Sequence, residues 1–146
     1  MAQLAQTLDR NTIVKGAVAG LIGGSVFGVQ MAVMGMLPMV ADMVGSSSVL
    51  VGFIVHMIIS AVIGITYVPL GTRLNGWLQI VGAGIAWGIL WWVLGALIIM
   101  PLVLGMGDMV LQVGEPQLMS LNGHIMFGIV MAGFFALISK EQMPVA

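Results

Sequence analysis

Four long stretches of the chain consist almost entirely of apolar residues. They cover about residues 16–40, 49–70, 77–104 and 118–139. Each is long enough to cross a hydrocarbon core about 30 Å thick as a helix, which takes roughly 20 residues. The alternation of apolar and polar residues that is typical of transmembrane barrel strands is absent from these stretches. The pattern therefore predicts an all-α, polytopic membrane protein with four transmembrane helices.

The polar segments between these stretches are short, so consecutive spans must pack side by side. This favours one membrane domain over residues 1–146, folded as a compact antiparallel bundle. Ser47 or Ser48 is a suitable N-cap for the second span. Residues 1–12 carry Leu4 and Leu8 one helical turn apart among polar residues, which predicts a short interfacial segment before the first span.

Composition supports the membrane assignment. The chain is 60% hydrophobic and only 6% charged, whereas a soluble domain carries about 25% charged residues. Too few polar groups exist to cover a surface in water, and no basic excess points to a nucleic-acid partner. The expected partners are the lipid bilayer and other membrane subunits or further copies of the chain. The absence of cysteine excludes disulfides and thiol chemistry.

The charges divide between alternating ends of the spans. The four basic residues, which lie in the N-terminal segment, the second loop and the C-terminal segment, are Arg10, Lys15, Arg73 and Lys140. The first and third loops contain only the acids Asp42, Asp108 and Glu115. Because basic residues stay preferentially on the cytoplasmic side, we expect both termini there, in a bacterial inner or photosynthetic membrane.

The same helical hairpin is used twice in the pattern. Pro38 lies near the end of the first span and Pro101 near the end of the third, and an acid-Met-Val triplet follows each proline. Each triplet then leads into a span that contains one histidine. Two tandem hairpins of equal orientation, related by an axis along the membrane normal, are therefore predicted.

Both histidines lie in columns of small residues spaced four apart, which places them on one helix face. The columns are Gly52, His56, Ser60, Gly64 and Ser120, His124, Gly128, Ala132. Each histidine lies about six or seven residues from the start of its span, or ~10 Å into the hydrocarbon at 1.5 Å per residue. Ionisable residues at such depth face the protein interior and mark candidate functional sites.

Three interpretations of His56 and His124 stay open. A neutral imidazole can bond a carbonyl or a serine such as Ser60. It can instead ligate a tetrapyrrole, with Gly52, Ser60 and Gly128 leaving room for a flat macrocycle. A haem held between both histidines, or a (bacterio)chlorophyll on either, would satisfy this second hypothesis. Proton or metal handling is the third.

Small residues also form tracks on the first and third spans. The tracks are Gly16, Gly20, Gly24, Gly28 on the first span and Gly84, Gly88 on the third. Such spacing lets helix backbones approach closely. Packing inside the bundle and an interface with another subunit are the two interpretations. The number of tracks favours some assembly.

The chain contains 14 methionines, several of them near the ends of the first and third spans. Thioether sulfur suits Cu(I). The spacing of Met39 and Met43 resembles the methionine pair of high-affinity copper transporters, which makes these residues candidate metal ligands. Methionine also fills irregular apolar cores, and this is the alternative.

Several short stretches resemble uncharacterised small bacterial inner-membrane proteins of the YagU kind. They are residues 16–20, 36–39, 91–95 and 122–124. The resemblance implies the four-span fold and no particular chemistry.

No nucleophile beside a base, metal-ligand triad or phosphate-binding loop is present in the sequence, so an enzyme is not expected. The leading hypothesis is an accessory subunit of a membrane complex of the electron-transfer or photosynthetic type, with the histidines as candidate pigment ligands. The alternatives are a small oligomeric transporter or channel for a metal ion or solute, with Gln30 on its path, and a scaffold without cofactor.

Overall fold

Helices account for nearly all of residues 9–140, the part of the chain that the computed structural model describes. The helices are α2 (Arg10–Val33), α3 (Leu37–Asp42), α4 (Val49–Gly71), α5 (Trp77–Trp91), the π-helix η1 (Trp92–Ile99), α6 (Met100–Val103), the 3₁₀ turn η2 (Gly107–Met109) and α7 (Glu115–Lys140). Four are long and apolar enough to cross a membrane: α2, α4, the continuous run α5–η1–α6, and α7. The predicted all-α membrane bundle is confirmed.

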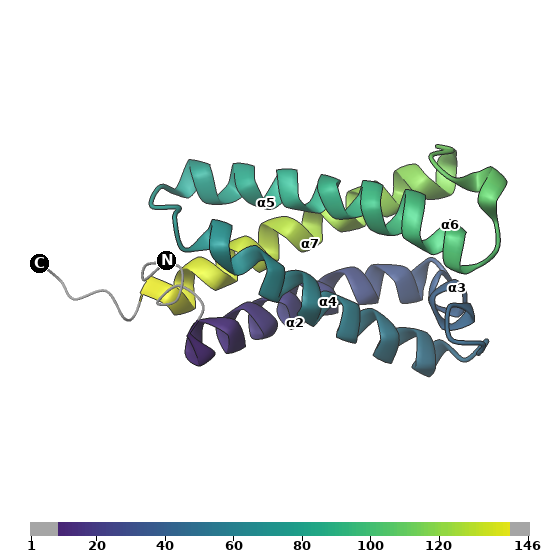
Figure 1. Ribbon diagram of the computed structural model, residues 1–146, viewed down its shortest axis with the longest axis horizontal. Coiled ribbons are helices and arrows are strands. Elements are labelled where there is room, and N and C mark those ends of the chain that lie inside the picture. Colours follow the sequence, from purple (N-terminus) through teal and green to yellow (C-terminus); the bar gives the residue numbers. More distant parts are fainter. Residues whose placement is uncertain (1–8, 141–146) are drawn as a thin grey trace, which may run out of the picture.

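The four long helices pack in the order α4, α2, α7, α5 (Figure 1). Each hairpin packs extensively within itself, α2 on α4 and α5 on α7, and the hairpins meet mainly through α2 and α7. Helices α4 and α5 have few contacts with each other. The prediction that consecutive spans pack side by side is therefore wrong for the second and third spans, because α2 and α7 occupy the centre of the bundle. Both ends of the described chain lie at one end of the bundle, and α3 and α6 lie at the other, which we call the α3 end.

The first span differs from the single helix predicted over residues 16–40. Helix α2 begins already at Arg10 and ends at Val33, and the chain then turns through Gly35 at φ +67°. Glycine adopts this left-handed conformation without the strain that a side chain would cause. Helix α3 follows with Pro38 in its first turn, where the missing N–H of proline needs no partner. The expected span is thus two helices.

Side-chain caps fix the beginnings of α2 and α4. Oδ1 of Asp9 accepts a hydrogen bond from the backbone N–H of Thr12 at 2.7 Å, and this bond lowers the pKa of the Asp9 carboxyl. Residues 1–8 of the interfacial segment expected over 1–12 lie outside the described residues, and the part from Arg10 belongs to α2. Ser48 caps α4 as predicted, accepting from the backbone N–H of Val51.

The third span changes its helical form after Trp91. Residues 92–99 follow the wider π-helical pattern, in which the N–H of Met100 bonds to the carbonyl of Gly95. In an α-helix the N–H of residue 101 would donate to the carbonyl of Leu97, but Pro101 has no N–H. That carbonyl instead accepts from the backbone N–H of Leu111 at 2.9 Å. Gly95, Ala96 and Ile99 of η1 line the pocket described below.

The glycine tracks are used inside the chain. A Cβ on Gly16 would lie 2.8 Å from the carbonyl oxygen of Gly64, and one on Gly84 would lie 2.6 Å from that of Gly128. The other predicted positions have the same role: Gly20 and Gly24 face Ser60, Gly28 faces Phe53 and Gly88 faces the backbone of His124. All six glycines therefore lie within the α2–α4 and α5–α7 interfaces, and the observation that favoured assembly no longer points to another subunit.

Both hairpins pack through corresponding residues. Gly20 on α2 contacts Ser60 and Gly64, which lie four and eight residues after His56. Gly84 on α5 contacts Gly128 and Ala132, which lie four and eight residues after His124. Small residues at the same distances from each histidine support the prediction of two tandem hairpins.

The correspondence between the residues of the two hairpins ends where the hairpins contact each other. Helices α2 and α7 approach closely because Gly23 lies against Phe127 and Gly123 lies against the ring of Phe27. Trp87 of α5 corresponds to Gly23 of α2, as Gly84 corresponds to Gly20, because both pairs are 64 residues apart. The Trp87 indole on α5 packs edge-on against Tyr67 of α4, whereas Gly23 lets α2 and α7 meet directly.

Candidate functional site

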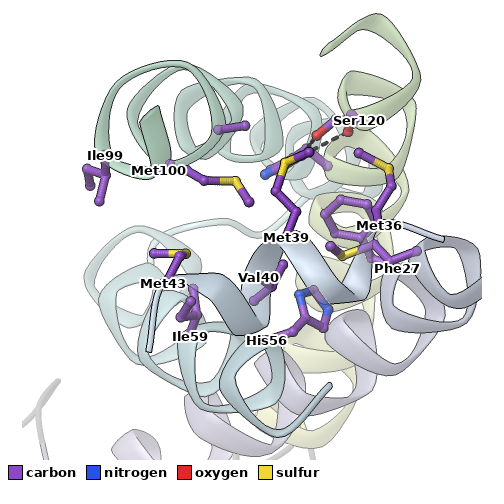
Figure 2. Close-up of a pocket in the computed structure, with 14 residues that line it drawn as sticks. Phe27, Met36, Met39, Val40, Met43, His56, Ile59, Ile99, Met100 and Ser120 are labelled. Atoms are coloured by element: carbon purple, nitrogen blue, oxygen red, sulfur yellow. Dashed lines mark hydrogen bonds between the residues drawn. The ribbon is translucent and has the colours of Figure 1, made fainter. Parts of the chain in front are cut away.

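A pocket of about 140 Å³ lies between the two hairpins in the half of the bundle near the α3 end (Figure 2). It is partly open to the surface between α4 and η1, where Ile59 and Ile99 are exposed. The residues around it come from both hairpins: Phe27, Met31, Met36, Met39, Val40, Met43, His56, Ile59, Gly95, Ala96, Ile99, Met100, Ser120 and His124. Both histidines predicted from the sequence thus reach the same cavity.

The ring of Phe27 contacts both imidazoles. Its centroid lies 5.3 Å from that of His56 and 4.7 Å from that of His124, with edge-to-face geometry in both pairs. Gly123, which has no side chain, leaves the space that the Phe27 ring occupies on α7. The two histidines are therefore held around one aromatic ring.

His56 is buried and joins α4 to α2. Its Nε2 lies 2.9 Å from the backbone carbonyl oxygen of Gly24. Because a carbonyl oxygen only accepts, Nε2 carries the proton and Nδ1 keeps its lone pair in the neutral imidazole. One turn further on, the hydroxyl of Ser60 donates to the carbonyl of His56 at 2.7 Å rather than to the ring. The hydrogen bond to a carbonyl matches the first interpretation of this histidine.

His124 has the opposite tautomer. Its Nδ1 lies 2.8 Å from the backbone carbonyl oxygen of Ser120, one turn earlier on α7, and 3.3 Å from the Ser120 hydroxyl. Nδ1 must donate to the carbonyl, so Nε2 keeps the lone pair. Each histidine therefore offers one unprotonated nitrogen, from different positions of the ring.

The small residues beside the histidines leave no room for a tetrapyrrole. Gly52 is covered by the carbonyl of Leu37, Ser60 lies against Gly24, and Gly128 lies against Gly84. The pocket of about 140 Å³ is also smaller than the roughly 300 Å³ at which sites for organic ligands begin. The residues do not fit a haem or (bacterio)chlorophyll, and the pigment hypothesis is corrected on this ground.

Methionine sulfur surrounds the pocket instead. Met39 and Met43, the two candidates from the sequence, both line it. They are joined by Met31 from α2, Met36 from the start of α3, and Met100 from α6. The sequence groups Met31 and Met36 with Met39 and Met43 near the end of the first span, but it did not predict that Met100 of the other hairpin joins them.

A second, more open cavity of about 670 Å³ lies at the α3 end, and we call it the vestibule. Its lining residues are Gly35, Met39, Asp42, Val103, Leu104 and Met106. Met39 belongs to both cavities. It therefore lies between the vestibule, which carries the carboxylate of Asp42, and the histidine pocket.

A packed layer closes the other end of the pocket. Tyr67, Ile80, Met131 and Phe135 are each at most 1% exposed. Tyr67 lies eight residues beyond Ile59 on α4, or about 12 Å further from the α3 end. The Tyr67 ring packs edge-on against Trp87 and Phe135 at centroid distances of 5.7 and 5.9 Å. The pocket thus has access on one side of this layer only.

Gln30 lies outside the pocket. Its Nε2 donates to the carbonyl of Met119 at 3.3 Å, a helix-to-helix bond of the expected kind, while its buried Oε1 has no partner among the described residues. The indole N–H groups of Trp87 and Trp91 and the hydroxyl of Tyr67 are likewise buried without a partner there.

No protein-family model, curated protein or solved structure matches this chain. The resemblance to small bacterial inner-membrane proteins therefore stays a prediction, and function must be argued from the pocket.

Proposed function

We propose that this chain is a non-enzymatic membrane protein that takes a small ligand into the pocket between its hairpins from one side of the membrane. The observation that carries the proposal is the arrangement of Met39, which borders both the vestibule and the pocket. The packed layer around Tyr67 lies on the far side. A cavity open toward one face and closed toward the other suits a binding protein or a carrier in one state, and it does not suit an open channel.

The distribution of charged residues supports one orientation of the bundle in the membrane. Arg10 and Lys15 lie in the first turns of α2 and Arg73 in the turn after α4, at the end of the bundle where both ends of the described chain lie. Asp42 and Asp108 lie at the α3 end. By the preference of basic residues for the cytoplasm, the vestibule faces away from the cytoplasm and both termini face toward it.

The side chains that line the pocket support the proposal that the protein is not an enzyme. Within residues 9–140, no three His, Cys, Asp or Glu side chains come together. The pocket offers two neutral imidazoles, one hydroxyl and otherwise apolar or thioether groups. The Ser120 hydroxyl lies 3.3 Å from Nδ1 of His124, but that nitrogen donates its proton to the carbonyl of Ser120 and so is not placed as a base toward the hydroxyl.

The absence of cysteine makes a direct test simple. In the single-cysteine variant Ala96→Cys the thiol lines the pocket, whereas in Ala132→Cys it lies in the packed α5–α7 interface, where Ala132 is 1% exposed. A small, membrane-impermeant thiol reagent should label Ala96→Cys in vesicles whose α3 end faces the reagent. Ala132→Cys should stay unlabelled.

Vesicles of the opposite orientation provide the control for sidedness. There the packed layer should protect Ala96→Cys from the same reagent. Equal labelling from both sides would indicate a continuous path and favour a channel. No labelling of Ala96→Cys from either side would overturn the proposal.

A further inference from the structure

The lining of the pocket is rich in soft ligand atoms. Five thioether sulfurs and two imidazoles surround a cavity of about 140 Å³, and no carboxylate is among the lining residues. Thioether and imidazole groups suit Cu(I), whereas Mg²⁺, Ca²⁺ and Mn²⁺ require oxygen ligands. The composition of the pocket is therefore selective against hard cations.

Three of the methionines lie on one face of the short helix α3 and its caps. Met36, Met39 and Met43 follow at intervals of three and four residues, which places their side chains on the same side of a helix. Figure 2 shows Met39 extending from α3 into the pocket and Met100 extending toward it from the opposite wall. Thioethers from both hairpins thus converge in the cavity.

The histidines are prepared as neutral ligands. His56 donates from Nε2 to Gly24 and His124 donates from Nδ1 to Ser120, so each keeps a lone pair on its other ring nitrogen. A hydrogen bond from one ring nitrogen to a backbone carbonyl is the usual support for an imidazole whose other nitrogen binds a metal.

We propose that the pocket binds a single Cu(I) ion through the sulfurs of Met39 and Met100 and an imidazole nitrogen of His56 or His124. The inference rests on the proposed function and names its ligand class. A monovalent ion with neutral ligands suits this depth, because burial in hydrocarbon penalises each additional charge. At about 30 Å³ for one water molecule, the cavity of about 140 Å³ has room for an ion together with a few water molecules.

Filling of an irregular core does not explain Met39. A filler side chain is enclosed by its neighbours, yet Met39 is 44% exposed and borders two cavities. Met106 and the carboxylate of Asp42 lie in the vestibule beside it. This sequence of a carboxylate, a thioether and then the inner thioethers and imidazoles gives a cation a path from water to the pocket.

The test is a competition for Cu(I) between the purified full chain in detergent and a chromophoric Cu(I) chelator, under anaerobic conditions with ascorbate. The pocket variant is Met39→Leu/Met100→Leu, which conserves side-chain volume. The matched control is Met57→Leu/Met126→Leu, because neither of these methionines lines the pocket. We expect the wild type and the control to retain about one Cu(I), and the pocket variant to bind it at least about tenfold more weakly.

X-ray absorption at the copper edge gives the ligands directly. Both sulfur and nitrogen scatterers are expected in the wild type, with fewer sulfurs in Met39→Leu/Met100→Leu. No retention of Cu(I) by the wild type, or equal affinity in the pocket variant, would overturn the inference. If the double variant fails to fold, as judged by its circular dichroism and elution, the single variant Met39→Leu gives the same comparison at an exposed residue.

Failure of this inference and failure of the proposed function are distinguishable. Sided labelling of Ala96→Cys without Cu(I) binding would keep the one-sided pocket and reject the metal. Cu(I) binding that depends on Met39 and Met100, combined with labelling from both sides, would keep the metal site and reject one-sided access.

Discussion

His56 donates its Nε2 proton to the backbone carbonyl oxygen of Gly24, 2.9 Å away on the neighbouring helix. The contact is short because Gly24, Gly20 and Gly64 let α2 and α4 approach through their backbones. The equivalent histidine, His124, bonds instead to Ser120 within its own helix. The two histidines occupy corresponding places in the two hairpins, yet only His56 ties two helices together.

This difference predicts unequal effects on stability. His56→Leu removes a hydrogen bond between helices and should lower the free energy of unfolding by about 1 kcal/mol, the size typical of such bonds in membrane proteins. His124→Leu removes a bond within α7 and should have a smaller effect. Unfolding in mixed detergent micelles measures both. A larger loss for His124→Leu would show that the α2–α4 bond is not the stabilising one.

A methyl group at the closest helix contact should destabilise the bundle. In Gly20→Ala the added Cβ would collide with the backbone carbonyl of Ser60, so the helices must separate. We expect a loss of about 1–3 kcal/mol in the free energy of unfolding. Gly82→Ala is the matched control, because nothing lies within 4 Å of a Cβ there. It should be neutral or stabilising by up to about 1 kcal/mol. Similar losses in both variants would contradict the α2–α4 packing.

The contact between α3 and α4 should control the position of Met39 in the pocket. Gly52 lies directly against the carbonyl of Leu37, so Gly52→Ala must lift α3 and move Met39. We expect weaker Cu(I) binding by about tenfold and faster proteolysis between α2 and α4. Gly107→Ala, at a position with no atom within 4 Å of a Cβ, should change neither. Unchanged Cu(I) affinity in Gly52→Ala would separate α3 from the metal site.

The orientation in the membrane is testable with two exposed residues. Ser47→Cys lies in the turn before α4 and Asn75→Cys in the turn before α5. On intact cells, an impermeant maleimide should label Ser47→Cys at once and Asn75→Cys only after permeabilisation. The reverse result would place the vestibule on the cytoplasmic side and overturn the assignment from charge.

The sequence alone determined which stretches of the chain can cross the membrane and which cannot. Long apolar runs gave four helices, since backbone groups in lipid must bond within the helix. Ser48 was identified as a cap from its side chain and its place before an apolar run. The close approach at Gly20 and Gly84 was also predictable, because a residue without a side chain permits it.

Only the tertiary structure decided which faces meet. In a soluble helix the polar face marks the outside, but here lipid and core are both apolar, so the sequence does not distinguish a lipid-facing residue from a buried one. For this reason the partners of the glycine tracks, the contact of Phe27 with both histidines and the order of the helices were not predicted. The Trp87 indole packs against Tyr67 of α4 where the other hairpin has Gly23. The methionines of α3 reach the pocket because the chain turns at Gly35. Which helix faces pack together can be decided only from the positions of the helices in space.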